Sequence, residues 1–159
     1  MIHRPTARIF LQSAKSEWYA FRVYIDSGAD ISLFTKTDAK LLSLNIYHGQ
    51  YRPIIGIGRT LIPAYIHQAN IRIGNTILKA SISFADSDEV PRLLGRTDIF
   101  KHFKITFNEK NLETIFETTD NMPSDMPTPE EKKAMETKDE VISEKELMKA
   151  LSMIKSHRL

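Results

Sequence analysis

The tripeptide Asp26-Ser27-Gly28 is the part of this sequence best suited to acid–base chemistry. It follows the apolar run Val23-Tyr24-Ile25, so the Asp26 carboxylate comes where a buried strand is expected to end. Burying an unpaired carboxylate costs several kcal/mol or forces its protonation, and a carboxyl group held there can transfer a proton. An isolated Asp-Ser-Gly is, however, more often a turn in which the aspartate caps its own loop. The tripeptide alone leaves both interpretations open.

Two further glycine-containing segments follow along the chain. Residues 51–58 and 61–67 flank a tip at Gly58-Arg59-Thr60, with a proline in each arm. Prolines in both arms predict a projecting hairpin with free edges rather than two central strands. Leu93-Leu94-Gly95 then ends an apolar run at a glycine, and Thr97-Asp98 is predicted to begin a short helix that continues through Phe103.

The elements that must position these segments are mostly short strands. Thr35 is predicted to cap a short helix from Lys36 to Leu42. Strands at short, regular spacing with one or two small helices predict a mainly β, barrel-like domain. The other predicted strands are residues 7–13, 18–25, 31–34, 68–74, 76–84, 105–107 and 114–116.

Three motifs together resemble the retropepsin-like aspartic proteases. Residues 25–30, Ile-Asp-Ser-Gly-Ala-Asp, resemble the catalytic loop of that family, whose pattern is apolar-Asp-Thr/Ser-Gly-Ala. Residues 54–58 resemble its glycine-rich flap, and residues 93–96 resemble the apolar-apolar-Gly-Arg segment that crosses behind its active site. The motifs occur in the family's order and cover residues 7–118. The resemblance implies a closed, acid-protease-like β-barrel.

The resemblance also implies the activity of an aspartic endopeptidase. Two-lobed aspartic proteases carry two Asp-Thr/Ser-Gly loops in one chain, whereas this chain has one and is too short for two lobes. The active form is therefore expected to be a homodimer, with one Asp26 from each copy on a two-fold axis. Two adjacent carboxyl groups would share a proton and activate a water molecule to attack a peptide bond.

Roles for the neighbouring residues follow from the same resemblance. Ser27 would hydrogen-bond across the dyad, and Gly28 would allow close approach of the partner loop and substrate. Asp30 would hold the substrate backbone or pair with Arg96. The predicted supporting loop is Ser27, Gly28 and Ala29; the predicted substrate-binding residues are Asp30, Ile55, Gly56, Ile57, Gly58 and Arg59; the predicted structural residues near the site are Leu94, Gly95 and Arg96.

The sequence departs from the family pattern at three places. Thr97 separates Arg96 from Asp98, where many relatives read Gly-Arg-Asp, and this insertion affects the register of the following helix. Arg59 stands at the flap tip, where small residues are common, and favours acidic substrates. The last predicted hairpin continues beyond Phe107 to Phe116, which leaves open whether a dimer would use interleaved termini.

The composition of the chain excludes several classes of function. A formal net charge of +2 implies no strong field for nucleic acid or membrane, and the absence of cysteine excludes thiolate chemistry and disulfides. The N-terminus lacks the apolar core of a signal peptide, so we expect a cytoplasmic protein. The acidic stretch 85–89 lacks the order of a calcium loop and is predicted to be solvated. We expect no metal or cofactor, because the histidines are scattered: His3, His48, His67, His102 and His157.

The chain divides by composition into a protease-like domain, residues 1–118, and a linker with a helical tail, residues 119–159. Residues 119–129 hold three prolines among polar residues and predict a linker. A helix over residues 144–157 would present Leu147, Leu151 and Ile154 on one face, which suits docking on a protein partner. A disordered extension is the alternative. Two other functions also remain open: a catalytically silent peptide-binding module of the same fold, and a scaffold that dimerises its tail.

Overall fold

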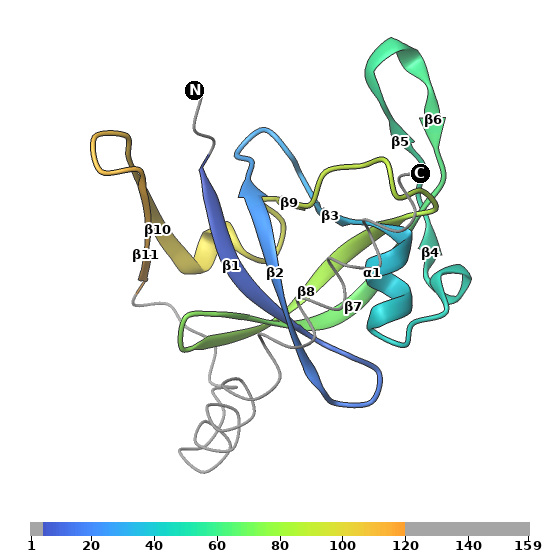
Figure 1. Ribbon diagram of the computed structural model, residues 1–159, viewed down its shortest axis with the longest axis horizontal. Coiled ribbons are helices and arrows are strands. Elements are labelled where there is room, and N and C mark those ends of the chain that lie inside the picture. The colour runs from blue at the N-terminus through green and yellow to red at the C-terminus, as the bar shows by residue number, and fades with distance from the viewer. Residues whose placement is uncertain (1–4, 120–159) are drawn as a thin grey trace, which may run out of the picture.

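The computed structural model describes residues 5–119, which form a mainly β domain (Figure 1). The sequence prediction of fold class is confirmed. The described elements are β1 Thr6–Gln12, β2 Trp18–Ile25, β3 Ser32–Phe34, α1 Lys36–Leu41, the 3-10 helix η1 Ile46–His48, β4 Gln50–Tyr51, β5 Ile54–Ile55, the 3-10 helix η2 Ile57–Arg59, β6 Leu61–Ile62, β7 Ala64–Ile73, β8 Thr76–Ala85, β9 Leu93–Leu94, the 3-10 helix η3 Phe100–His102, β10 Phe103–Asn108 and β11 Glu113–Thr118.

The main sheet closes on itself as a barrel. Its strands run in the order β1-β2-β9-β3-β8-β7-β4, and a further pairing of β1 with β7 closes the first six strands into a ring. The short strand β9 lies parallel to β2 on one side and antiparallel to β3 on the other. The Leu93–Leu94 segment is therefore placed between the two strands that flank the Asp26 loop.

The barrel is filled by alternating inward side chains. Ile9 and Leu11 of β1 and Phe21 and Val23 of β2 are at most 1% exposed. The ring of Phe34 packs edge-on against Phe21, with centroids 5.3 Å apart. Complete burial of such side chains stabilises a fold by about 1.5–3 kcal/mol each, so this core holds the strands that carry the Asp26 loop.

Helix α1 begins at the predicted cap. The Thr35 hydroxyl accepts the Asp38 N–H (3.1 Å), and the Asp38 carboxylate accepts the Thr35 N–H (3.1 Å), which completes a capping box. The helix is short and ends at Leu41, with Leu42 as its C-cap. The capping prediction is confirmed, and the predicted end lay one residue too far.

The predicted helix from Thr97 to Phe103 is wrong in extent. Only Phe100–His102 is helical, as a single 3-10 turn. Asp98 has φ 65°, in the left-handed region, which a right-handed helix cannot include. The inserted Thr97 therefore lies in a tight turn before η3 rather than in a helix.

Prolines also shorten the flap-like hairpin. The predicted arms, residues 51–58 and 61–67, are each divided: β4 pairs with β7, whereas β5 pairs only with β6. Pro53 and Pro63 stand at the two breaks, where their missing N–H groups interrupt the ladders. The β5–β6 hairpin consequently projects from the barrel (Figure 1).

The closing hairpin, β10–β11, forms its own two-stranded sheet. Phe103 of β10 and Phe116 of β11 pack edge-on, with ring centroids 5.5 Å apart. Phe103 belongs to the barrel core and Phe116 packs against that core, so these two side chains attach the hairpin to the barrel. The predicted linker and helical tail lie outside the described residues. None of the helices within residues 5–119 has the length and apolar character needed to cross a bilayer.

Candidate active site

The Asp26 loop begins where β2 ends, as the sequence predicts. The Asp26 N–H donates to the Leu94 carbonyl (3.0 Å), so β9 supports the loop directly. The Ala29 N–H donates to the Asp26 carbonyl (3.2 Å), which closes the turn. Ser27 and Gly28 are exposed at its tip, and Asp26 is half-buried.

One oxygen of the Asp26 carboxylate is held in place. Oδ1 accepts the Gly28 N–H at 2.9 Å, which is the turn geometry considered as the alternative to catalysis. No hydrogen bond to Oδ2 is made by any residue in the range 5–119. The turn therefore orients the side chain and leaves one oxygen for another group, so the two interpretations are compatible.

Gly95 brings the segment after β9 against the back of this loop. A Cβ at position 95 would lie 2.5 Å from the Ile31 carbonyl carbon and 2.6 Å from its oxygen. The Gly95 N–H donates to the Ser32 hydroxyl (3.0 Å), which is fully buried. Since the opposing atoms are backbone atoms, the contact requires glycine at this position.

The next two residues continue the attachment. The Arg96 N–H donates to the Ala29 carbonyl (3.0 Å), and the Thr97 N–H donates to the Asp30 carbonyl (2.7 Å). Each residue from Leu94 to Thr97 thus contacts the backbone of the segment from Asp26 to Ile31. The resemblance to the retropepsin-like family implied that residues 93–96 cross behind the Asp26 loop, and these hydrogen bonds show how the two segments are held together.

The side chains of Asp30 and Arg96 do not pair in this chain. Both are exposed, and the ion pairs formed within residues 5–119 do not include one between them. The sequence-based alternative of an Asp30–Arg96 pair is therefore not realised here. The two segments are joined through their backbones, and both side chains face solvent.

The flap-like hairpin ends in a tight, glycine-dependent turn. The Gly56 N–H donates to the Thr60 carbonyl (2.8 Å), and the Arg59 N–H donates to the Gly56 carbonyl (3.2 Å). Gly58 and Arg59 both have left-handed backbones, with φ 80° and 63°; this conformation costs a residue other than glycine roughly 1–2 kcal/mol. Ile57 begins the 3-10 turn.

The hairpin presents apolar side chains to solvent. Ile55 is 72% exposed and Leu61 opposite it is 62% exposed. In Figure 1 this hairpin and the loop after β2 rise from the same end of the barrel. An exposed apolar pair on a projecting hairpin is suited to covering a bound peptide.

Asp86 anchors the base of this hairpin, which the sequence did not reveal. Its N–H donates to the Pro63 carbonyl (2.7 Å), and its carboxylate pairs with Lys36 (2.7 Å) and accepts the Tyr47 hydroxyl (3.3 Å). The hydrogen bond and charge of Asp86 raise the pKa of Lys36 above its ordinary value. The predicted solvated acidic loop is therefore wrong for Asp86, because the strands bring three distant segments to it.

Three tyrosines stack beside Asp86. The Tyr65 ring lies 5.3 Å from that of Tyr47 and 5.4 Å from that of Tyr51. Desolvation, followed by the charge of Asp86, raises the pKa of the Tyr65 hydroxyl. Because Tyr51 and Tyr65 lie on the strands entering and leaving the hairpin, this cluster braces its base.

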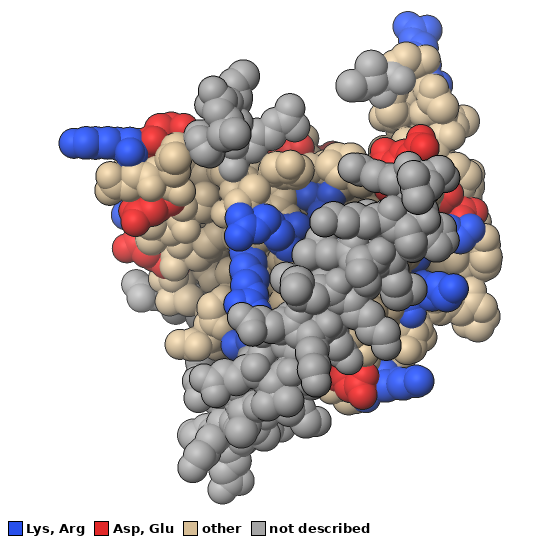
Figure 2. All heavy atoms as spheres, in the orientation of Figure 1, with Lys and Arg blue, Asp and Glu red and all other residues tan. Residues whose placement is uncertain are grey.

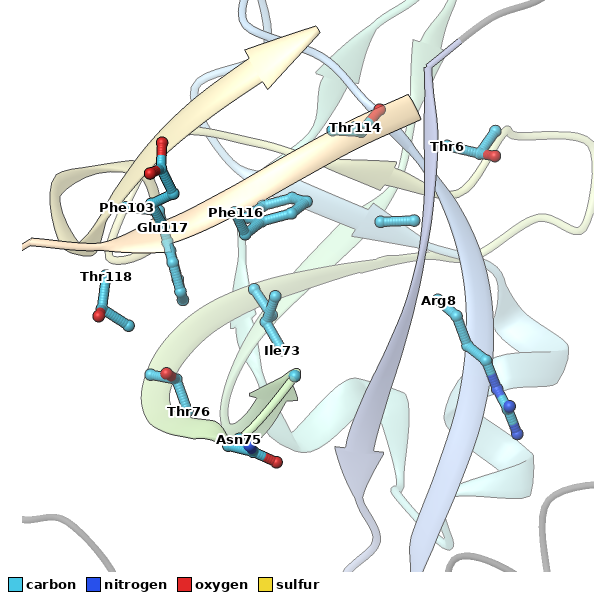
Figure 3. Close-up of a pocket in the computed structure, with 12 residues that line it drawn as sticks. Thr6, Arg8, Ile73, Asn75, Thr76, Phe103, Thr114, Phe116, Glu117 and Thr118 are labelled. Atoms are coloured by element: carbon cyan, nitrogen blue, oxygen red, sulfur yellow. The ribbon is translucent and has the colours of Figure 1, made fainter. Parts of the chain in front are cut away.

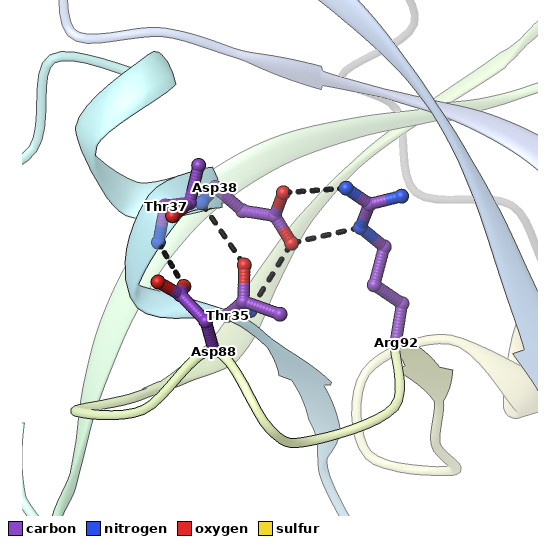
Figure 4. Close-up of polar contacts among 5 residues, drawn as sticks. All are labelled: Thr35, Thr37, Asp38, Asp88 and Arg92. Atoms are coloured by element: carbon purple, nitrogen blue, oxygen red, sulfur yellow. Dashed lines mark hydrogen bonds and ion pairs between the residues drawn. The ribbon is translucent and has the colours of Figure 1, made fainter. Parts of the chain in front are cut away.

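Asp38 and Arg92 form a buried ion pair between α1 and the segment leading to β9 (Figure 4). Arg92 Nε and Nη2 donate to the two carboxylate oxygens of Asp38, at 2.9 and 2.8 Å. Asp38 is 1% exposed, and the Arg92 carbonyl accepts the Tyr24 N–H (3.0 Å). The pair thus fixes β9 near Asp26. Its sequence signal, the Thr-x-x-Asp capping box, gives no indication of Arg92.

A sizeable cavity lies away from the Asp26 loop. It measures about 790 Å³ and lies between β1, the β7–β8 turn and the closing hairpin (Figure 3). Ile73 and Phe116 point into it, and Asp26 is not among its lining residues. Within residues 5–119, no group of three or more potential metal ligands occurs.

Some known proteins resemble this chain in sequence or in fold. No family model matches the chain. The Arabidopsis thaliana protein DNA-DAMAGE INDUCIBLE 1 is 30% identical over 96 residues, which cover 59% of this chain and 23% of that protein. The chain therefore spans about a quarter of that relative's length.

Two solved structures share the fold. The retroviral protease-like domain of Ddi1 from Leishmania major matches with a TM-score of 0.50 and 14% identity, over 77% of this chain and 100% of that one. A retropepsin-like aspartic protease from Rickettsia conorii matches with a TM-score of 0.50 and 20% identity, over 67% and 96%. The described residues therefore have the retropepsin-like aspartic protease fold that the three sequence motifs predicted.

Proposed function

We propose that the protein is an aspartic endopeptidase whose active site is completed by a second copy of the chain. The observation that carries the proposal is the placement of Asp26. Its backbone is fixed to β9, one carboxylate oxygen is oriented by Gly28, and the other accepts no hydrogen bond from residues 5–119. The retropepsin-like fold supports the same assignment.

The second Asp26 is needed because one chain supplies one such loop. Two carboxyl groups meeting on a two-fold axis cannot both ionise easily, so they share one proton, as in aspartic proteases generally. The apparent pKa values then belong to the pair rather than to either residue. A single Asp26 loop has no such partner.

The dyad would hydrolyse a peptide bond with water alone. The ionised carboxylate takes a proton from the bound water as its oxygen adds to the carbonyl carbon. The protonated carboxyl group hydrogen-bonds the carbonyl oxygen, which becomes the oxyanion. Collapse of this intermediate breaks the C–N bond, and the leaving nitrogen takes up a proton from the dyad.

The hairpin β5–β6 would close over an extended substrate. Its exposed Ile55 and Leu61 offer apolar contact, and closure would exclude water from the dyad. Arg59 at the turn and Asp30 beside the loop are exposed and would contact substrate groups. Ser27 would join the two Asp26 loops.

Apolar side chains on the closing hairpin are candidates for the contact between copies. Phe107, Leu112 and Ile115 are 42%, 57% and 43% exposed. Phe107 and Ile115 lie on β10 and β11, and Leu112 lies in the turn between them. These two strands form a sheet of their own that is not paired with the main sheet. A contact here would suit a dimer formed through a hairpin rather than through interleaved termini.

The proposal is tested by comparing the wild-type chain with Asp26→Asn on a peptide library between about pH 4 and 7, the range of such dyads. The wild-type chain should give defined fragments and Asp26→Asn none. Glu89→Gln is the matched control, because it removes an exposed carboxylate charge in the same way. Identical fragments from wild type and Asp26→Asn, or no cleavage by either, contradict the proposal.

A catalytically silent peptide-binding module is the second candidate. The exposed apolar pair on the flap-like hairpin favours peptide binding whether or not chemistry follows. Such a module would bind peptides equally well in the wild-type chain and in the Asp26→Asn variant, and would release them intact. A binding assay run beside the cleavage assay separates the two functions.

A further inference from the structure

The outer face of four barrel strands carries positive charge without any acid of its own. Strands β1, β2, β7 and β8 contain no Asp or Glu. Their register places Arg8 opposite Arg22, Phe10 opposite Arg72, and Lys79 opposite Asn70, so these side chains share one face. We call Arg8, Arg22, Arg72 and Lys79 the arginine face.

Like charges on directly opposed residues of neighbouring strands are unfavourable. Arg8 and Arg22 are such a pair, and both are exposed. Figure 2 shows blue Lys and Arg side chains gathered on the face over β1 and β2. Repulsion between Arg8 and Arg22 destabilises the isolated domain. A negatively charged group bound at this face would remove that repulsion.

The arginines are preorganised for such a group. The guanidinium carbons of Arg72 and Arg8 lie 4.1 and 5.2 Å from the centroid of the Phe10 ring. Arg22 Nη1 donates to the Thr6 hydroxyl (3.4 Å). Stacking on an aromatic ring restrains a guanidinium, and a restrained, planar guanidinium can pair with both oxygens of a carboxylate. In Arg72, Nη1 also donates to the Gly74 carbonyl (3.3 Å).

Three of the four cations of this face, Arg8, Arg22 and Lys79, are not paired with a carboxylate of the described domain. Glu117, which lines the same cavity as Arg8, pairs with Lys104 (3.3 Å). An acidic partner for Arg8, Arg22 and Lys79 would therefore come from outside residues 5–119.

The sequence contains a segment of matching charge. Residues 1–118 hold 15 Lys and Arg against 11 Asp and Glu, whereas residues 120–147 hold 9 Asp and Glu against 4 Lys, a net charge of −5. The segment follows directly after Thr119, whose N–H donates to the His102 carbonyl (3.0 Å). At up to about 3.3 Å per residue it is long enough to reach any face of a domain of this size.

From this charge complementarity we infer that the arginine face binds the acidic segment 120–147 of its own chain. Tethering raises the effective concentration of the segment to roughly millimolar, so individually weak Arg–carboxylate contacts suffice. Binding neutralises the opposed arginines and covers the face against other polyanions. The inference does not depend on the chemistry of Asp26.

The absence of cysteine gives a direct test on the full chain. A nitroxide attached to Ser143→Cys broadens the NMR signals of backbone amides near the acidic segment. The amides of Arg8, Arg22 and Arg72 should be broadened selectively, and those of Lys40 and Lys110 should not. Uniform broadening, or none, overturns the inference.

A charge-reversal pair separates specific binding from general attraction. Arg8→Glu with Arg22→Glu should abolish the selective broadening. Lys40→Glu with Lys110→Glu, the same charge change at exposed sites on α1 and the β10–β11 turn, should leave it intact. Broadening that survives reversal of the arginine face contradicts the inference.

Two further measurements complete the test. In the chain with its native arginines, about 0.5 M NaCl should remove the broadening, because the Debye length falls to roughly 4 Å. This measurement requires no substitution on the arginine face. In an equal mixture of isotope-labelled chain without nitroxide and nitroxide-labelled chain without isotope, the selective broadening should be absent. Its appearance there would identify a second copy as the source and overturn binding within one chain.

Discussion

Gly95 lies so close to Ile31 that a Cβ at position 95 would come within 2.5 Å of the Ile31 carbonyl carbon. This contact joins the segment after β9 to the loop that carries Asp26. It is made between two backbones, neither of which can move without disturbing the hydrogen bonds from Asp26 to Leu94 and from Arg96 to Ala29. The geometry of the candidate active site therefore depends on a residue that contributes no chemistry.

Gly95→Ala should lower the free energy of unfolding by at least about 1–3 kcal/mol, the usual cost of overpacking. Urea denaturation measures this change, and any proteolytic activity should fall with it. Gly56→Ala is the control, because the atoms nearest a Cβ there are 3.5 Å away, at ordinary contact distance. Equal stability of the two variants would contradict the close contact at Gly95.

Arg92→Met should be strongly destabilising, by about 3–5 kcal/mol, because it leaves the buried Asp38 carboxylate without its partner. The double variant Arg92→Met/Asp38→Asn should recover part of this loss in urea denaturation, since no buried charge remains. Lys104→Met, which breaks the exposed pair with Glu117, should change stability by less than about 1 kcal/mol. Additive effects of the Arg92 and Asp38 substitutions would argue against a coupled pair.

Stability should fall as the pH rises above 10. The pKa of Lys36 is raised from 10.5, mainly by its hydrogen bond to Asp86, and the pKa of Tyr65 is raised from 10.0, mainly by desolvation. A group with a raised pKa stabilises the fold below its unfolded pKa, and this contribution is lost as the pH rises through the folded value. Both groups therefore act in the same direction.

Urea denaturation from about pH 9 to 11.5 measures this dependence. Lys36→Met and Tyr65→Phe should each reduce its slope. Lys40→Met, on the same helix as Lys36, should retain the wild-type slope. A slope unchanged in both test variants would contradict an electrostatic role for Asp86 at the base of the hairpin.

Arg59→Glu should change the substrate preference of the proposed protease without unfolding it. Arg59 is exposed at the hairpin turn, and an exposed ion pair contributes about 0.2–1 kcal/mol, or up to about fivefold in kcat/KM. Peptides with acidic residues should be cleaved more slowly and those with basic residues faster, as fragment analysis of a library would show. Lys110→Glu, on the opposite hairpin turn, should leave the preference as it is.

Mixing the wild-type chain with an excess of Asp26→Asn should suppress activity. If each site needs one Asp26 from each of two chains, only wild-type pairs are active. With a tenfold excess of the variant, the activity per wild-type chain should fall about tenfold at exchange equilibrium. Activity that is unaffected by the excess would show that a single chain supplies a complete site.

Sequence patterns were sufficient to predict the local features around Asp26. Alternating apolar strands predicted a mainly β domain, and the capping-box residues at Thr35 predicted the start of α1. The three glycine-containing motifs predicted the retropepsin-like fold through their resemblance to that family, whereas the contact that requires Gly95 is made with the distant Ile31. The Asp26 turn depends on neighbours within two residues.

The tertiary structure decided the contacts between distant segments. Asp38 and Arg92 pair across 54 residues, and Asp86 joins α1 to the base of the hairpin; no periodicity in the sequence encodes either partner. The residue types favoured a helix from Thr97 to Phe103, but the left-handed backbone of Asp98 prevents a helix from including that residue. The sequence by itself therefore determined which loop carries the carboxylate. The insertion of β9 between β2 and β3 decided how that loop is held, because long-range backbone pairing depends on the whole barrel and not on any one segment.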